Sequence, residues 1–326
     1  MIVAISNRKQ WIDALRGIAI LLVLYGHCLP FWDEYFIYTS PIKIPLFFAI
    51  TGFVLNTQKD EPKFFFKKWL KRLVIPYFLL AIIPVVIFIP ITPISGTVEK
   101  IEKILNGETF WFMPCMIIGN LVFYLYCHFV KKIYLKIAIA FICSIVGYIL
   151  AQNHVLDFCF INVAFEIQFF YIIGYFLKHY MEHITSYYNV WILVVPMAII
   201  YILICMLSSF VFPSQSLDVH LSYYYNIPVC LVLILLGLGC LFFSASRIYK
   251  WPRFLIFVGQ NSLILYMWAG FVWIFVDYIL YNCGITIPKS IFGGILKATG
   301  QIVICSCVAL IINKHLPILV GKNKPK

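Results

Sequence analysis

Runs of apolar residues recur along almost the whole chain and limit what it can fold into. We count ten, at residues 12–30, 42–57, 73–93, 110–129, 133–151, 157–177, 190–212, 224–244, 254–281 and 291–313. Most are close to the roughly 20 residues that a helix needs to cross the hydrocarbon core of a bilayer. We therefore predict an all-α integral membrane protein, a single bundle of about ten transmembrane helices in one domain covering residues 1–326.

Two of these runs differ from the others in length. The second is short and is interrupted by Pro45 and Gly52. The ninth, at 254–281, is long, so we expect a tilted helix or one that extends beyond the bilayer.

The composition excludes a soluble protein. Hydrophobic residues make up 63% of the chain and charged residues 12%, whereas soluble proteins contain about 25% charged residues. The net charge of +12 would suit nucleic acid, but the cations lie in short segments between apolar runs, as membrane topology requires. We expect membrane lipid as a partner and no nucleic acid. The 11 cysteines include no CxxC motif, and we interpret them as buried hydrophobic residues rather than disulfides or metal ligands.

The distribution of Lys and Arg predicts the orientation. If the N-terminus lies inside, only five of the 25 Lys and Arg fall in outside segments: Lys43, Lys100, Lys103, Lys289 and Lys297. Such a bias toward the inside is the usual determinant of orientation. We therefore expect a multi-pass protein of the cell (inner) membrane with both termini in the cytoplasm.

The first apolar run carries three ionisable residues, Asp13, Arg16 and His27. At about 100° per residue, all three lie on one face of a helix, with His27 roughly 16 Å beyond Arg16. Ionisable groups at membrane depth are costly and usually mark functional sites. A plainer interpretation stays open, in which Asp13 and Arg16 form an interfacial pair and His27 lies at the far interface.

A basic cluster precedes the third run, in FFFKKWLKRLVIPY. It contains Lys67, Lys68, Lys71 and Arg72, with Trp69 among them. Such a cluster can be a topology signal alone. It can also bind phosphates, and Trp69 then offers an aromatic ring for stacking.

Segments throughout the chain resemble, in order, the acyltransferase-3 family of integral membrane O-acyltransferases, of the type that acetylates surface glycans. Arg16 and His27, in IDALRGIAILLVLYGH, match the family's Arg and His, which are separated by ten residues. Weaker matches are PLFFAITGFVL at 45–55, the basic run ending at Pro76, FWFMP at 110–114, FFYIIGYFLK at 169–178 and GQNSLILYMW at 259–268.

The match has departures that leave two segments open to interpretation. Thr51 stands where the family has Ser, and Trp69 stands where it has an Arg three residues before Arg72. No histidine follows the ninth-run segment, where Trp268 and Ala269 stand. The roles of the basic run and of the ninth run are therefore less closely defined by the resemblance.

The resemblance implies transfer of an acetyl group from cytoplasmic acetyl-CoA to a hydroxyl of a cell-surface or lipid-linked glycan. A neutral imidazole is the usual base for an alcohol, so His27 would take the proton. Arg16, three residues after Asp13 and able to pair with it, would lie along the path of the acetyl-CoA donor. Other candidates are Lys68, Lys71, Arg72 and Trp69 for the donor, Trp111, Asn261 and Ser262 for substrate, and Glu166 to orient His27 or Arg16.

Two other functional classes remain possible from the sequence. Proline-broken helices and buried charges also suit a transporter or flippase for a lipid-linked sugar or anionic solute. A non-catalytic membrane sensor is the third class. His154 and His220, in outer loops, could contact a glycan, but the sequence alone favours no such role for them. The acceptor sugar, the hydroxyl that is acylated and a homo-oligomeric state are not determined by these residues.

The orientation can be tested with reporter fusions at Lys326 and in the 213–222 loop. Because 20 of the 25 Lys and Arg fall on the inner side, we expect a cytoplasmic signal at Lys326 and an extracytoplasmic signal in the loop. An extracytoplasmic signal at Lys326 would contradict the ten-span topology.

Overall fold

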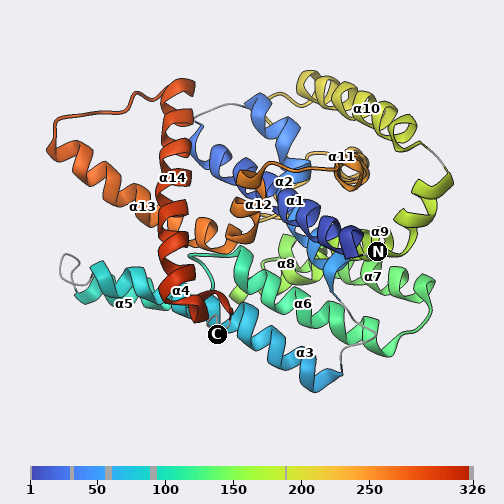
Figure 1. Ribbon diagram of the computed structural model, residues 1–326, viewed down its shortest axis with the longest axis horizontal. Coiled ribbons are helices and arrows are strands. Elements are labelled where there is room, and N and C mark those ends of the chain that lie inside the picture. The colour runs from blue at the N-terminus through green and yellow to red at the C-terminus, as the bar shows by residue number, and fades with distance from the viewer. Residues whose placement is uncertain (1, 30–32, 56–60, 89–93, 188, 323–326) are drawn as a thin grey trace.

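The structure is a computed structural model that describes residues 2–29, 33–55, 61–88, 94–187 and 189–322. Its regular secondary structure in these ranges is helical, apart from one bridge between Asp218 and Tyr223 (Figure 1). Nine described helices are long and apolar enough to cross a membrane, or ten when one bent pair counts as a single span. The predicted all-α polytopic architecture is confirmed.

Most described helices follow one another with short connections, and a longer loop at 212–226 joins α10 to α11. They are α1 (Ile2–Cys28), α2 (Asp33–Val54), α3 (Pro62–Trp69), α4 (Ile75–Phe88), α5 (Ile94–Leu105), α6 (Phe112–Phe129), α7 (Ile133–Gln152), α8 (Ile161–Glu166), α9 (Gln168–Tyr187), α10 (Val190–Val211), α11 (Ile227–Arg247), α12 (Arg253–Gln260), α13 (Ser262–Asn282) and α14 (Ile291–His315). Short helical turns lie at Leu70–Val74 (η1), Phe158–Phe160 (η3) and Pro317–Val320 (η4). We call the end of the bundle where α3 begins and α14 ends the basic end.

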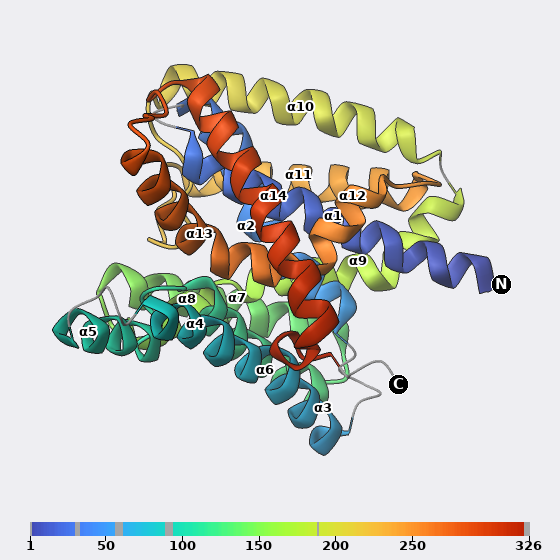
Figure 2. The ribbon, with the colours of Figure 1, turned by 60° about the vertical axis from the view of Figure 1, so that its left-hand side comes forward.

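Helix α1 runs through the middle of the bundle, packed against α2, α11, α12, α13 and α14 (Figures 1 and 2). Its contact with α12 brings the backbones of the two helices directly together. A Cβ on Gly17 would collide with the carbonyl of Leu255, and a Cβ on Gly259 would collide with the carbonyl of Asp13. Small residues permit such close approach between membrane helices. The α1–α12 contact therefore holds the polar residues of α1 beside the break after Gln260.

The second span differs from the prediction of a short segment at 42–57. Helix α2 runs over 22 residues and contains both Pro41 and Pro45. Proline removes one backbone hydrogen bond, but neighbouring helices let membrane helices keep it. The second span is therefore of full length.

The basic cluster lies inside the third span rather than before it. Helices α3 and α4 are joined by η1, a π-helical turn at Leu70–Val74, into a continuous span from Pro62 to Ile87. Pro76 follows this turn and cannot donate a hydrogen bond to the carbonyl of Arg72, four residues earlier. Single π-turns inside α-helices frequently occur at functional sites. This one carries Lys71 and Arg72.

Two predicted continuous spans are broken in the structure. The ninth is divided at Asn261 into α12 and α13, so its length is explained by a break and not by tilt. The sixth bends by 47° between Glu166 and Gln168. The sequence analysis also missed α5, an amphipathic helix between the third and fourth spans.

Candidate active site

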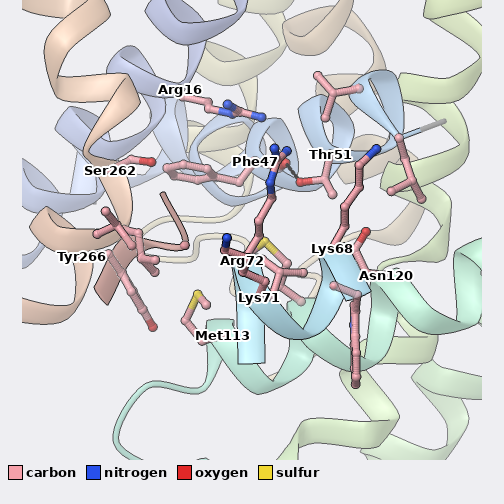
Figure 3. Close-up of a pocket in the computed structure, with 18 of the residues that line it drawn as sticks. Arg16, Phe47, Thr51, Lys68, Lys71, Arg72, Met113, Asn120, Ser262 and Tyr266 are labelled. Atoms are coloured by element: carbon pink, nitrogen blue, oxygen red, sulfur yellow. Dashed lines mark hydrogen bonds between the residues drawn. The ribbon is translucent and has the colours of Figure 1, made fainter. Parts of the chain in front are cut away.

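A cavity of about 920 Å³ opens among α1, α2, α3, α6, α12 and α13 near the basic end. Its volume is within the usual range of about 300–1,000 Å³ for small-molecule sites. The residues labelled in Figure 3 show its two sides: Arg16 and Ser262 on one, Lys68, Lys71 and Arg72 on the other. Phe47, Met113 and Tyr266 contribute apolar surface to the lining. We call this space the donor cavity, after the acyl donor that the sequence analysis expects its basic residues to bind.

The charge of the donor cavity is strongly positive. Six cationic side chains line it, namely Arg16, Lys67, Lys68, Lys71, Arg72 and Lys322, and its described lining includes no Asp or Glu. Charges at membrane depth usually face a bundle interior or a water-filled cavity. The arrangement fits a ligand with several negative charges at one end.

Trp69 is fixed in the wall of this cavity. Its Nε1 donates a hydrogen bond of 2.9 Å to the carbonyl of Ile117 on α6. The Nζ of Lys68 lies 4.1 Å from the centre of the Phe64 ring. The structure thus brings together all four residues that the sequence predicted for the donor.

Arg16 and Asp13 form the expected pair. Arg16 Nη1 donates to Asp13 Oδ1 at 3.4 Å, and Gln260 Nε2 donates to Asp13 Oδ2 at 3.0 Å. Since 33% of the Arg16 side chain is exposed, its guanidinium can still reach a ligand in the donor cavity. Asp13 is therefore placed to position Arg16.

His27 lies outside the lining of the donor cavity, toward the opposite end of the bundle. Val23, one turn earlier on α1, is a lining residue, so His27 is about 6 Å farther along the helix. Lys43 Nζ lies 3.5 Å from the position of a Cβ on Gly26, and the charges of Lys43 and Asp218 act on the exposed His27 ring. The imidazole is thus near charged groups of α2 and of the 212–226 loop.

Glu166 is engaged at the bend between α8 and α9. Its carboxylate accepts hydrogen bonds from the hydroxyls of Ser222 and Tyr224. The described residues contain no hydrogen bond between Glu166 and His27 or Arg16. Its direct partners belong to the 212–226 loop, so the geometry gives it a role in anchoring that loop.

The three predicted substrate residues lie apart. Ser262 lines the donor cavity. Asn261 is buried, with its Nδ2 donating to the carbonyl of Phe257 at 2.8 Å and its Oδ1 accepting from Asn313 at 2.6 Å. The Trp111 ring, at the opposite end, lies 4.8 Å from that of His220.

The sequence analysis missed the contribution of the C-terminal segment. Gly321, with φ of 69°, follows η4 and packs against Lys71, whose carbonyl would be only 2.6 Å from a Cβ at this position. Lys322 Nζ donates to Asn313 Oδ1 at 2.7 Å. Burial lowers the pKa of Lys322, and the charge of Asp13 acts to raise it. A glycine after a short turn is a visible signal of a left-handed residue, but the sequence does not show what it packs against.

Comparison with known proteins identifies one family. A family model described as an acyltransferase domain matches residues 9–313 of the chain. Searches among curated proteins and among solved structures find no match.

Because six cations line the donor cavity, we predict that coenzyme A binding depends on their charge. Replacing Lys68, Lys71 and Arg72 together with Gln should weaken coenzyme A binding by at least about tenfold, because hydrogen bonds to charged groups contribute about 1.5–3 kcal/mol each. Calorimetric titration of the detergent-purified protein measures this. The matched control replaces Lys63, Lys131 and Lys132 with Gln. This removes the same number of positive charges from residues outside the cavity lining. Equal affinities in the two triple variants would show that the cluster is a topology signal only.

Lys322 provides a second, smaller test. Lys322→Gln should weaken coenzyme A binding by about two- to fivefold, since exposed charge pairs contribute about 0.2–1 kcal/mol. Lys314→Gln, at the end of α14 and outside the cavity lining, should leave the affinity unchanged. If both variants bind coenzyme A as the parent does, the C-terminal segment does not contribute to the site.

Proposed function

This chain belongs to the acyltransferase-3 family, whose domain covers residues 9–313, and from that premise we propose that it moves an acetyl group from cytoplasmic acetyl-CoA to a hydroxyl of a cell-surface or lipid-linked glycan. It is a membrane acyltransferase, since the family transfers acyl groups and the bundle has nine to ten apolar spans among its described residues. The donor, the acceptor and the orientation in the inner membrane belong to the proposal.

The observation that carries the proposal is the donor cavity. Coenzyme A bears several phosphate charges at one end and its reactive thioester at the other. Lys67, Lys68, Lys71, Arg72 and Lys322 supply cations for the phosphates, and Arg is suited to bind phosphate oxygens with two parallel hydrogen bonds. The apolar surface of Phe47, Met113 and Tyr266 fits the uncharged remainder of the donor.

Helix α1 supports a path for the thioester from the cations to His27. Arg16 and Val23 both line the donor cavity, and His27 follows Val23 by one turn on the same helix. Asp13 and Gln260 hold Arg16 beside this path through the hydrogen bonds of Asp13. In the proposed orientation, the phosphates stay near the cytoplasm while the acyl group reaches the outer half of the bundle.

The proposed chemistry uses His27 as a general base. Its imidazole removes the proton of the acceptor hydroxyl as the hydroxyl oxygen attacks the thioester carbonyl carbon. The carbon–sulfur bond then breaks, and the proton passes from the imidazolium to the leaving thiolate of coenzyme A. General base catalysis contributes typically about 10²–10⁴-fold in rate.

His27→Gln tests the mechanism. Glutamine keeps much of the size and hydrogen bonding of histidine but cannot act as a base near neutral pH, so acetyl transfer should fall by about 10²–10⁴-fold. Coenzyme A binding should persist, because the cations that line the donor cavity belong to other residues and Arg16, the one on α1, lies roughly 16 Å from His27 along that helix. The measurement is the acetyl content of the host's surface polysaccharide by NMR, with and without the variant, together with donor titration.

Arg16→Ala is the informative companion variant. It should reduce donor affinity as well as acetyl transfer, because Arg16 lines the donor cavity. If His27→Gln protein acetylates glycan at the parental rate, His27 is not the base. If the parent chain does not bind coenzyme A at all, a transporter or sensor function replaces the proposal.

A further inference from the structure

A second cavity, of about 340 Å³, lies at the end of the bundle opposite to the basic end. Its lining includes Glu108, His154, Asp157 and His220 from the loops after α5, α7 and α10, together with Phe160 of η3 and Asn162 of α8. On the premise of the proposed function, we propose that this cavity is the acceptor subsite and that it takes an uncharged sugar through its hydroxyl groups.

The polar groups of this cavity match sugar hydroxyls. Carboxylates accept hydrogen bonds at two oxygens each, and Glu108 and Asp157 place two of them on the lining. Asn162 Nδ2 donates to Asp157 Oδ1 at 2.6 Å, which orients that carboxylate. The described lining contains no Lys or Arg. His154 Nδ1 lies 3.5 Å from Asp157 Oδ2 and is a cation only when it is protonated. While His154 is neutral, a sugar carrying a carboxylate or phosphate would meet the two carboxylates and no permanent cation of the lining, so the site favours an uncharged sugar.

Phe158, Phe160 and His220 give the cavity an aromatic face, and Trp111, outside the lining, packs on His220. The His220 ring lies 4.8 Å from the ring of Trp111 and 5.1 Å from that of Phe160. The backbone N–H of His220 donates to Asp218 Oδ1 at 2.9 Å, which fixes the loop. Burial lowers the pKa of His220, and the charge of Asp218 acts to raise it. A neutral imidazole can accept a hydrogen bond from a hydroxyl.

The backbone around the cavity is held in an unfavourable conformation. His154, Leu156, Cys159 and Phe160 have φ values of 54°, 59°, 51° and 56°, in the left-handed region that non-glycine residues rarely adopt. Such residues cluster at ligand sites, where the surrounding structure over-determines them. Here the bond from Cys159 N to the carbonyl of Asn106, at 3.1 Å, ties this loop to the end of α5. The strain is thus concentrated in a loop that lines the cavity.

Two connections bring this cavity close to the path of the acyl group. Trp111 packs on His220, while the next residues, Phe112 and Met113, line the donor cavity. The two cavities therefore lie on either side of the start of α6. In addition, Asp218, whose charge acts on His27, is two residues from His220. A sugar in the second cavity would thus be next to the loop that faces the proposed base.

Binding of sugars without any chemistry tests the proposal. The detergent-purified full chain is probed by saturation-transfer difference NMR with three neutral probes, namely the methyl glycosides of glucose, galactose and rhamnose. The fourth probe is methyl glucuronide, and the fifth is de-O-acetylated surface polysaccharide from a host lacking this chain. We expect signals from a neutral glycoside or the polysaccharide, and a signal from methyl glucuronide at least about fivefold weaker than that of methyl glucoside.

Carboxylate variants complete the test. Glu108→Gln combined with Asp157→Asn should reduce the sugar signals at least about fivefold, and Glu108→Gln alone, at an exposed position, should reduce them in the same direction. Glu99→Gln, on α5 and paired with Lys103 at 2.6 Å, removes an exposed carboxylate outside the cavity lining and should change nothing. Coenzyme A affinity is measured on the same samples and should be unchanged in all variants.

The outcomes separate this inference from the proposed function. Three results would overturn the acceptor subsite: no signal from any neutral sugar or the polysaccharide, signals that persist in both carboxylate variants, or equal binding of methyl glucuronide. If coenzyme A still binds in these cases, the acyltransferase proposal stays in place. Loss of sugar signals in the carboxylate variants with coenzyme A binding retained supports it. If the parent chain fails to bind coenzyme A, the sugar signals still decide whether the cavity binds sugar.

Discussion

The contact between α1 and α12 is the interaction on which the rest of the bundle depends. At Gly17 and Gly259 the two backbones meet with no room for a Cβ, so the start of α1 and the break after α12 lie side by side. The bond from Gln260 to Asp13 and the pairing of Asp13 with Arg16 follow from this contact. A larger residue at either glycine would separate the helices and remove Arg16 from its place in the donor cavity.

The irregular backbone of the protein is concentrated where its polar groups meet. Backbone that departs from the α-helix at membrane depth is tolerated where it is buried in protein or lines a cavity. The π-turn at Leu70–Val74 and the break at Asn261 both border the donor cavity, and the 47° bend near Glu166 borders the loop that Ser222 and Tyr224 anchor. The local interruptions therefore shape the sites, while the regular spans supply the apolar scaffold.

The two cavities differ in charge as their proposed ligands do. The donor cavity is lined by cations alone among its charged described residues, whereas the second cavity carries Glu108 and Asp157 and no Lys or Arg in its described lining. Phosphates and uncharged sugars would thus be sorted by electrostatics at opposite ends of one bundle. His27 lies between these ends, one turn from Val23 and within reach of the charge of Asp218.

The sequence alone determined the class of fold, the number of spans to within one, and the pairing of Asp13 with Arg16, because hydrophobic length and helical spacing are local properties. It also grouped Lys68, Lys71 and Arg72 correctly, since one helix carries them.

Only the tertiary structure decided that Gly321 and Lys322, some 250 residues away, close the same cavity. It likewise decided that Glu166 meets Ser222 and Tyr224, and that His154 and His220 line one cavity. Such contacts depend on which helix faces pack together, and apolar runs of similar length leave that choice to side-chain packing and to close backbone approaches at particular glycines.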